Sequence, residues 1–146
     1  MHPETQEILF ACNAFHEHVV FAAFVRPDES CWIGVEALAI LAEEGIDGVI
    51  RDVPTDCISI DHSHAFGGSI VVVYMGALPA VIGAFEGLRG LHGWIAKNMA
   101  PTLARVVGGI RARRMERDVL GLAMLYATSG VNPNGNPAGV GTAPAV

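Results

Sequence analysis

Residues 28–45 constrain the fold more than any other stretch, because they carry the clearest helix signature in the chain. The proline before them prevents a helix from continuing into the stretch, and Asp28 or Ser30 can cap its first turn. Gly45 stands where a left-handed C-terminal cap belongs. Apolar residues recur at spacings of three and four, which predicts one apolar face. The stretch therefore predicts a helix over about residues 30–44.

The predicted helix places Cys31 in its first turn. There the unpaired backbone N–H groups and the positive end of the helix dipole stabilise a thiolate relative to a thiol, as at many nucleophilic cysteines. Such a cysteine also needs a base within hydrogen-bond distance. The pattern predicts Cys31 as nucleophile and His64 as general base, with His62 as the rival base. The alternatives are that Cys31 is a small core residue and that His62 and His64 lie in a polar loop between two strands.

Charge is distributed unevenly along the 146 residues, whose net charge is −6. Residues 1–66 carry twelve acids and two bases, whereas residues 86–146 carry seven bases and three acids. We expect these two regions to attract each other within the fold or across a dimer. The overall acidity argues against a general nucleic-acid binder. An apolar fraction of 51 % fits one domain with a sizeable core.

The three cysteines, Cys12, Cys31 and Cys57, do not form an even disulfide set. The first residues are acidic and lack the positive region of a signal peptide. Both features favour a reducing, cytoplasmic setting.

Several Cys and His residues have spacings that metal ligands can adopt. Cys12 and His16 would share a helix face, and two His-x-His pairs occur, at residues 16–18 and 62–64. No Cys-x-x-Cys or His-Glu-x-x-His spacing is present, and no glycine pair fits a phosphate loop. We therefore expect neither a metal nor a cofactor.

The N-terminal half mixes helix and strand patterns. Residues 4–25 predict a helix, although residues 19–25 fit a buried strand equally well. Residues 57–61 alternate weakly, and residues 69–75 are rich in β-branched side chains. These two segments predict a β-hairpin.

The C-terminal half predicts two helices, over residues 79–98 and 102–128. In the first of them Gly83, Gly87 and Gly90 lie on roughly one side. Each glycine weakens a helix by about 1 kcal/mol relative to alanine, so close packing must compensate. The arginine-rich part of the second helix predicts a solvated face or a partner for the acidic half.

Together the patterns predict an α+β fold, a small antiparallel sheet flanked by helices with a helical C-terminal half. We expect one domain over residues 1–130 and a flexible, uncharged tail over residues 131–146. The uncharged run at residues 67–85 is near the minimum length of a membrane span. Because glycines and a proline interrupt it, we expect a strand followed by a helix there instead.

Three short motifs within residues 28–75 resemble the papain-like and transglutaminase-like cysteine enzymes. Residues 30–32 (Ser-Cys-Trp) resemble the Cys-Trp pair that opens the papain-type helix. Residues 39–49 resemble the end of the corresponding helix in transglutaminase-like domains, and residues 64–66 (His-Ala-Phe) resemble their His-Ala-aromatic strand. The resemblance implies a cysteine nucleophile and a histidine base. No Asp or Asn follows in the expected place, so the third catalytic residue stays unassigned.

Three functions are compatible with the sequence. The first is a small cysteine-dependent hydrolase or acyl-transfer enzyme acting on a peptide or amide-like substrate. The second is a non-catalytic subunit of a homo-oligomer or larger assembly, in which glycine-faced helices, complementary charges and an uncharged tail serve packing. The third, a membrane-associated helical protein, has the least support. We expect no nucleic-acid partner.

Overall fold

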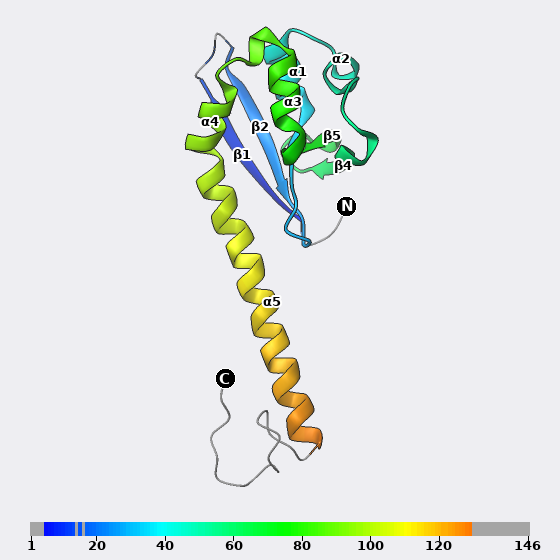
Figure 1. The fold of residues 1–146 in the computed structure, drawn as a ribbon, viewed down its shortest axis with the longest axis vertical. Coiled ribbons are helices and arrows are strands. Elements are labelled where there is room, and N and C mark those ends of the chain that lie inside the picture. The colour runs from blue at the N-terminus through cyan, green and yellow to red at the C-terminus, as the bar shows by residue number, and fades with distance from the viewer. Residues whose placement is uncertain (1–4, 14, 16, 130–146) are drawn as a thin grey trace. The chain divides into compact units, whose positions relative to one another are not determined.

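Five antiparallel strands and five α-helices make up the part of the chain that the computed structural model describes, residues 5–13, 15 and 17–129 (Figure 1). The strands are β1 (Gln6–Cys12), β2 (Val19–Val25), β3 (Cys31–Gly34), β4 (Ile58–Ser63) and β5 (Gly68–Tyr74). The α-helices are α1 (Val35–Ala42), α2 (Ile46–Ile50), α3 (Leu78–Ala84), α4 (Leu91–Asn98) and α5 (Ala100–Ser129). The 3-10 turns are η1 (Thr55–Cys57), η2 (Met75–Ala77) and η3 (Glu86–Leu88). The predicted α+β fold is confirmed.

The chain divides into two compact units, Met1–Val107 and Gly108–Val146. The first unit holds the sheet, helices α1 to α4 and the first turns of α5, and the second holds the remainder of α5. The helix predicted at residues 102–128 is confirmed, with ends that differ by one or two residues. The tail predicted for residues 131–146 lies outside the described residues.

The predicted hairpin is confirmed, because β4 pairs with β5 from Ile58 opposite Val73 to Ser63 opposite Gly68. The helix predicted for residues 4–25 is wrong. Residues 6–12 form β1, which pairs with all seven residues of β2, and residues 19–25 adopt the alternative strand interpretation. The apolar spacing of this region fits either state, and the pairing between the two strands selects extended backbone.

The helix predicted from residue 30 is wrong at its start. Residues 31–34 form β3, and α1 begins at Val35 after the extended residue Gly34. Trp32 and Ile33 pair with β2 on one side and with β5 on the other, which gives this short segment backbone partners on both sides. The helix also ends earlier than predicted, because Glu43 takes the left-handed cap position.

The helix predicted for residues 79–98 is interrupted, because α3, η3 and α4 replace it. Gly90 has a φ of +86°, a left-handed conformation that favours glycine. A Cβ on Gly87 would lie 2.2 Å from the carbonyl oxygen of Leu41 in α1. Close packing is therefore confirmed at Gly87, whereas a Cβ on Gly83 would meet nothing within 4 Å.

The uncharged run at residues 67–85 forms β5, η2 and α3, which confirms a strand followed by a helix. Among the residues with described positions, no helix combines the length and the apolar character that crossing a membrane requires.

The sheet curls strongly, as contacts between its outer strands show. The strand order is β1-β2-β3-β5-β4, so four inter-strand steps separate β1 from β4. In a flat sheet these steps of about 4.8 Å would hold the two strands about 19 Å apart. Instead, the Glu7 carboxylate of β1 accepts hydrogen bonds from the Ser63 hydroxyl of β4 and from the His64 backbone N–H at 2.9 Å. The sheet therefore bends until its two outer strands meet at this point.

Alternate residues of β2 pack on opposite faces of the sheet and contribute to two parts of the core. On the concave side, which we call the inner face, Phe24 packs in a buried cluster with four other residues: Ala22, Trp32, Ile70 and Val72. Gly34 allows this close approach, because a Cβ there would lie 3.2 Å from the Ile70 side chain. On the opposite face, Phe21 contacts Trp94 of α4 with ring centroids 5.4 Å apart. Burial on both faces explains why all of β2 is apolar.

Candidate functional site

The structure does not join the residues predicted to form a Cys–His site. Cys31 is the first residue of β3, while His62 lies on β4 and His64 directly after it. The two histidine rings contact each other, with centroids 5.1 Å apart. Within the described residues, no hydrogen bond connects the Cys31 sulfur to a histidine nitrogen.

The local electrostatics at Cys31 differ from those of a helix N-terminus. Partial burial raises the pKa of the Cys31 thiol, and the negative charge of Asp28 raises it further. The premise of a thiolate stabilised by a helix dipole is therefore wrong, because the residue lies in a strand beside an acid. The catalytic roles of Cys31, His64 and His62 stay predictions without this support.

We expect Cys31 to react with iodoacetamide at pH 7 no faster than a small free thiol such as glutathione, because only the thiolate is nucleophilic. The rate should rise with pH as the thiol ionises. Asp28→Asn should accelerate the reaction, since it removes a charge that raises the Cys31 pKa. Mass spectrometry of the labelled peptides measures each cysteine separately. Rapid labelling of Cys31 alone at neutral pH would instead restore the nucleophile hypothesis.

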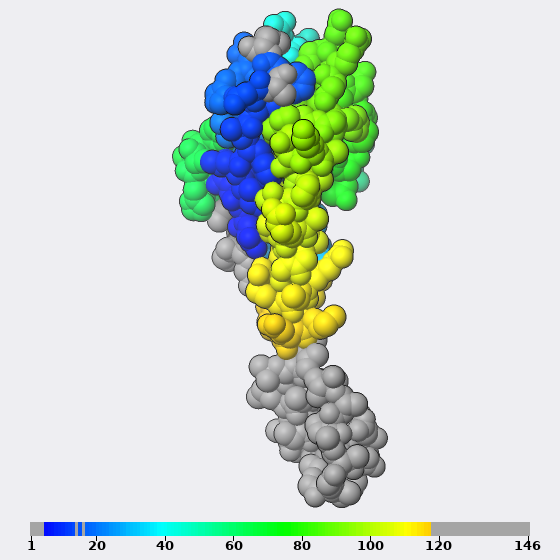
Figure 2. All heavy atoms as spheres, turned by 90° about the vertical axis from the view of Figure 1, so that its left-hand side faces the viewer, coloured from blue at the N-terminus to red at the C-terminus, as the bar shows by residue number. Residues whose placement is uncertain are grey.

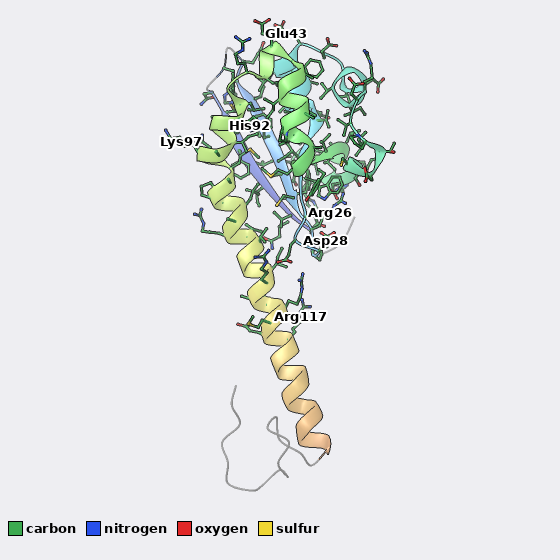
Figure 3. The ribbon with its side chains drawn as sticks, viewed as in Figure 1. Arg26, Asp28, Glu43, His92, Lys97 and Arg117 are labelled. Carbon is green, nitrogen blue, oxygen red and sulfur yellow. The ribbon has the colours of Figure 1, made fainter. Side chains whose placement is uncertain are left out.

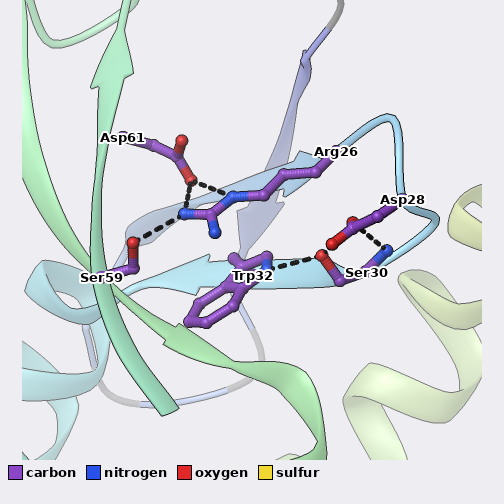
Figure 4. Close-up of polar contacts among 6 residues, drawn as sticks. All are labelled: Arg26, Asp28, Ser30, Trp32, Ser59 and Asp61. Carbon is purple, nitrogen blue, oxygen red and sulfur yellow. Dashed lines mark hydrogen bonds and ion pairs between the residues drawn. The ribbon is translucent and has the colours of Figure 1, made fainter. Parts of the chain in front are cut away.

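The best-defined polar site in the first unit is centred on Arg26, at the end of β2 (Figure 4). Its Nη2 donates to Asp61 Oδ2 at 2.9 Å and to Ser59 Oγ at 2.9 Å, and its Nε donates to Asp61 Oδ2 at 3.3 Å. Its guanidinium carbon lies 4.2 Å from the ring centroid of Trp32, a cation–π contact. We call Arg26, Ser59, Asp61 and Trp32 the Arg26 cluster.

A hydrogen-bonded chain from the β2–β3 turn holds the indole of this cluster. Trp32 Nε1 donates to Ser30 Oγ at 2.8 Å, and the Ser30 hydroxyl and backbone N–H both donate to Asp28 Oδ1. The hydroxyl and then the N–H of Ser30 lower the pKa of Asp28, and the charge of Arg26 lowers it further. Asp28 and Arg26 lie at the same end of the sheet (Figure 3). The turn thus presents Trp32 in a fixed orientation to the guanidinium.

The Arg26 cluster pairs its own two charges. Asp61 is 3 % exposed and Arg26 is 18 % exposed, so the ion pair is largely shielded from water. Its hydrogen bonds join β2 to β4, two strands that are not neighbours in the sheet. We therefore interpret the cluster as a structural link across the inner face.

Sequence reasoning missed this cluster, although two signals could have indicated it. Arg26 is one of only two bases in residues 1–66. Ser59, Asp61 and Ser63 alternate along a strand, which places three polar side chains on one face. Two of the three, Asp61 and Ser63, are buried.

The metal hypothesis gains no support in the described residues, where no three His, Cys, Asp or Glu side chains gather around a common point. Cys12 is fully buried on β1 rather than on a helix. His18 instead forms a hydrogen bond with Asn13. His16 lies outside the described residues.

A second candidate site is a surface on α5. All seven residues from 111 to 117 are exposed, and Met115 among them is 68 % exposed (yellow in Figure 2). Seven consecutive helical residues cover about two turns, so this part of α5 is exposed on every side. The prediction of a solvated face for the arginine-rich segment is confirmed, and over residues 111–117 the exposure covers every side of the helix.

Comparisons of the chain with protein-family models, with curated proteins and with solved structures found no match. The resemblance to papain-like and transglutaminase-like enzymes therefore stays a prediction.

Proposed function

We propose that the protein is a non-catalytic assembly subunit that associates with further copies of itself through α5. One observation carries the proposal, the exposure of α5 on every side over residues 111–117. Helices in proteins gain most of their stability from packing an apolar face, and a helix without such packing is marginal in water. A segment of a long helix that is exposed in this way is well suited to a partner.

The composition of α5 supports the same function. After Asp118 the helix continues with residues 119–129, which carry no charge and are mostly apolar. Burying apolar side chains against a partner is worth about 25 cal/mol for each Å² removed from water. Met115, within the charged part of α5 that precedes these residues, is also apolar and exposed.

The enzyme hypothesis has less support. Its argument required a thiolate at a helix start and a histidine close to it. Cys31 lies in a strand, and its pKa is raised. The Arg26 cluster, which is better ordered by hydrogen bonds, contains no cysteine.

Sedimentation velocity of the full chain tests the proposal over a concentration series from about 1 to 200 µM, which spans weak to moderate affinities. We expect a species of at least twice the monomer mass whose population grows with concentration. A chain that stays monomeric across the whole series would overturn the proposed function.

A further inference from the structure

Two exposed histidines, His62 and His64, lie side by side where the β4–β5 hairpin turns. The centroids of their rings are 5.1 Å apart, and the angle between the ring planes is 84°. In the part of the chain that the structure describes, neither ring takes part in a hydrogen bond or an ion pair, whereas the ring of His18 bonds to Asn13. Two imidazoles are therefore gathered at one point of the surface, and their ring nitrogens are available to a ligand.

We infer that His62 and His64 together bind one divalent transition-metal ion of the class that prefers imidazole, which includes Zn²⁺, Ni²⁺ and Cu²⁺. Neutral imidazole is the commonest metal ligand that proteins supply. Two nitrogens from the chain leave the other coordination positions to water, so this site differs from the groups of three or more ligands that the described residues lack. The inference uses no residue of α5 and does not depend on the proposed self-association.

The separation of the two rings matches the separation that a shared ion requires. A zinc–nitrogen bond of about 2.0–2.1 Å places the ion about 3.2 Å from the centroid of each imidazole. Two imidazoles bound at the tetrahedral angle then have centroids about 5.2 Å apart. The centroids of His62 and His64 are 5.1 Å apart, so both rings reach one ion without a movement of the backbone.

The angle between the rings also suits a shared ion. A metal ion lies in the plane of each imidazole that binds it, because the nitrogen lone pair lies in that plane. The planes of parallel, stacked rings never cross, whereas planes at 84° do, and an ion on the line where they cross lies in both. Both side chains are exposed, so rotation about the bond to the ring can aim one nitrogen of each at the ion.

Hydrogen bonds hold the backbone between the two histidines in place. Ser63 is fully buried, and its hydroxyl donates to Glu7 and accepts from the Phe66 N–H at 3.0 Å. The Ser63 carbonyl accepts from the Gly67 N–H at 2.9 Å, and the His64 N–H donates to Glu7 at 2.9 Å. A site whose ligands are positioned before the ion arrives loses less conformational freedom on binding.

Isothermal titration calorimetry with zinc chloride tests the site in a full chain carrying Cys31→Ser and Cys57→Ser, because cysteine thiolates also bind zinc. His62→Gln and His64→Gln should each weaken zinc binding at least tenfold, since either one leaves a single imidazole and removes the gain from chelation. Each single substitution should therefore remove the one strong binding event. Two histidines that bind separate ions would instead each remove half of the bound zinc, and that result would refute a shared ion.

His92→Gln is the matched control, because His92 is an exposed histidine of α4 that has no ring contact with another histidine in the described residues (labelled in Figure 3). We expect this substitution to change zinc binding less than twofold. All three histidines are exposed, so the variants should fold, which circular dichroism verifies. Equal weakening by His62→Gln and His92→Gln, or a chain that binds no zinc, would overturn the metal site.

Thermal unfolding gives an independent measurement. An ion that binds the folded hairpin raises the unfolding temperature as its concentration rises. We expect zinc to raise the unfolding temperature of the Cys31→Ser, Cys57→Ser chain and of its His92→Gln variant, and to leave that of its His62→Gln variant unchanged. An equal effect of zinc on all three proteins would mean that the ion binds elsewhere, and it would overturn the site.

Discussion

Arg26→Met is expected to lower the free energy of unfolding by about 3–5 kcal/mol, the cost of removing one partner of a buried ion pair. Asp61 is 3 % exposed and receives two of the hydrogen bonds of Arg26. Without the guanidinium its carboxylate would be left buried and uncompensated. Met has a similar length and retains apolar contact with Trp32, so the loss reports on charge more than on volume. Urea denaturation at neutral pH measures the effect.

Two further variants make this result specific. Arg51→Met removes an exposed arginine at the end of α2 and should change stability by less than about 0.5 kcal/mol. Arg26→Met combined with Asp61→Leu removes both charges and should recover much of the loss, because replacing a whole buried pair with apolar residues is often neutral. If the single and the double variant are equally unstable, the ion pair is not the cause.

Glu7→Ala is expected to lower the free energy of unfolding by about 2–4 kcal/mol, because hydrogen bonds to a charged acceptor contribute about 1.5–3 kcal/mol each. The Glu7 carboxylate accepts from the Ser63 hydroxyl and from the His64 backbone N–H. Ser63 is fully buried, so its hydroxyl would lose an acceptor that water cannot easily replace. The outer strands β1 and β4 would also lose the contact that fixes the curl of the sheet.

Hydrogen exchange distinguishes this local effect from general destabilisation. The His64 amide should exchange faster in Glu7→Ala under native conditions, while amides in the centre of β2 should change less. Glu7→Gln keeps one carbonyl acceptor and should lose less stability than Glu7→Ala. Asp52→Ala, at an exposed position, serves as the control. Unchanged exchange at His64 would mean that Glu7 does not hold the two strands together.

The elements predicted correctly depend on short-range information. The β4–β5 hairpin follows from β-branched side chains and a glycine-containing connection, all within 17 residues from Ile58 to Tyr74. Helix α5 follows from a proline in its first turn and a long series of helix-forming residues. In both cases the signal and the structure involve neighbours in the chain.

One of the elements predicted incorrectly, the start of the helix at residues 31–34, depends on distant partners. The apolar spacing after Cys31 fits a helix, but Trp32 and Ile33 pair with Tyr74 and Val73, about 40 residues later in the chain. The backbone hydrogen bonds and the burial available between β2 and β5 select the strand for residues 31–34. The Arg26–Asp61 pair, 35 residues apart, could not be predicted for the same reason.

The sequence by itself determined the α+β class, the β4–β5 hairpin, the long C-terminal helix and its solvated arginine-rich segment, because local propensity and periodicity specify such features. Only the tertiary structure decided the state of the chain around Cys31, the curl of the sheet and the buried partner of Arg26. These depend on which strands become neighbours, and on how far that arrangement removes charged and polar groups from water.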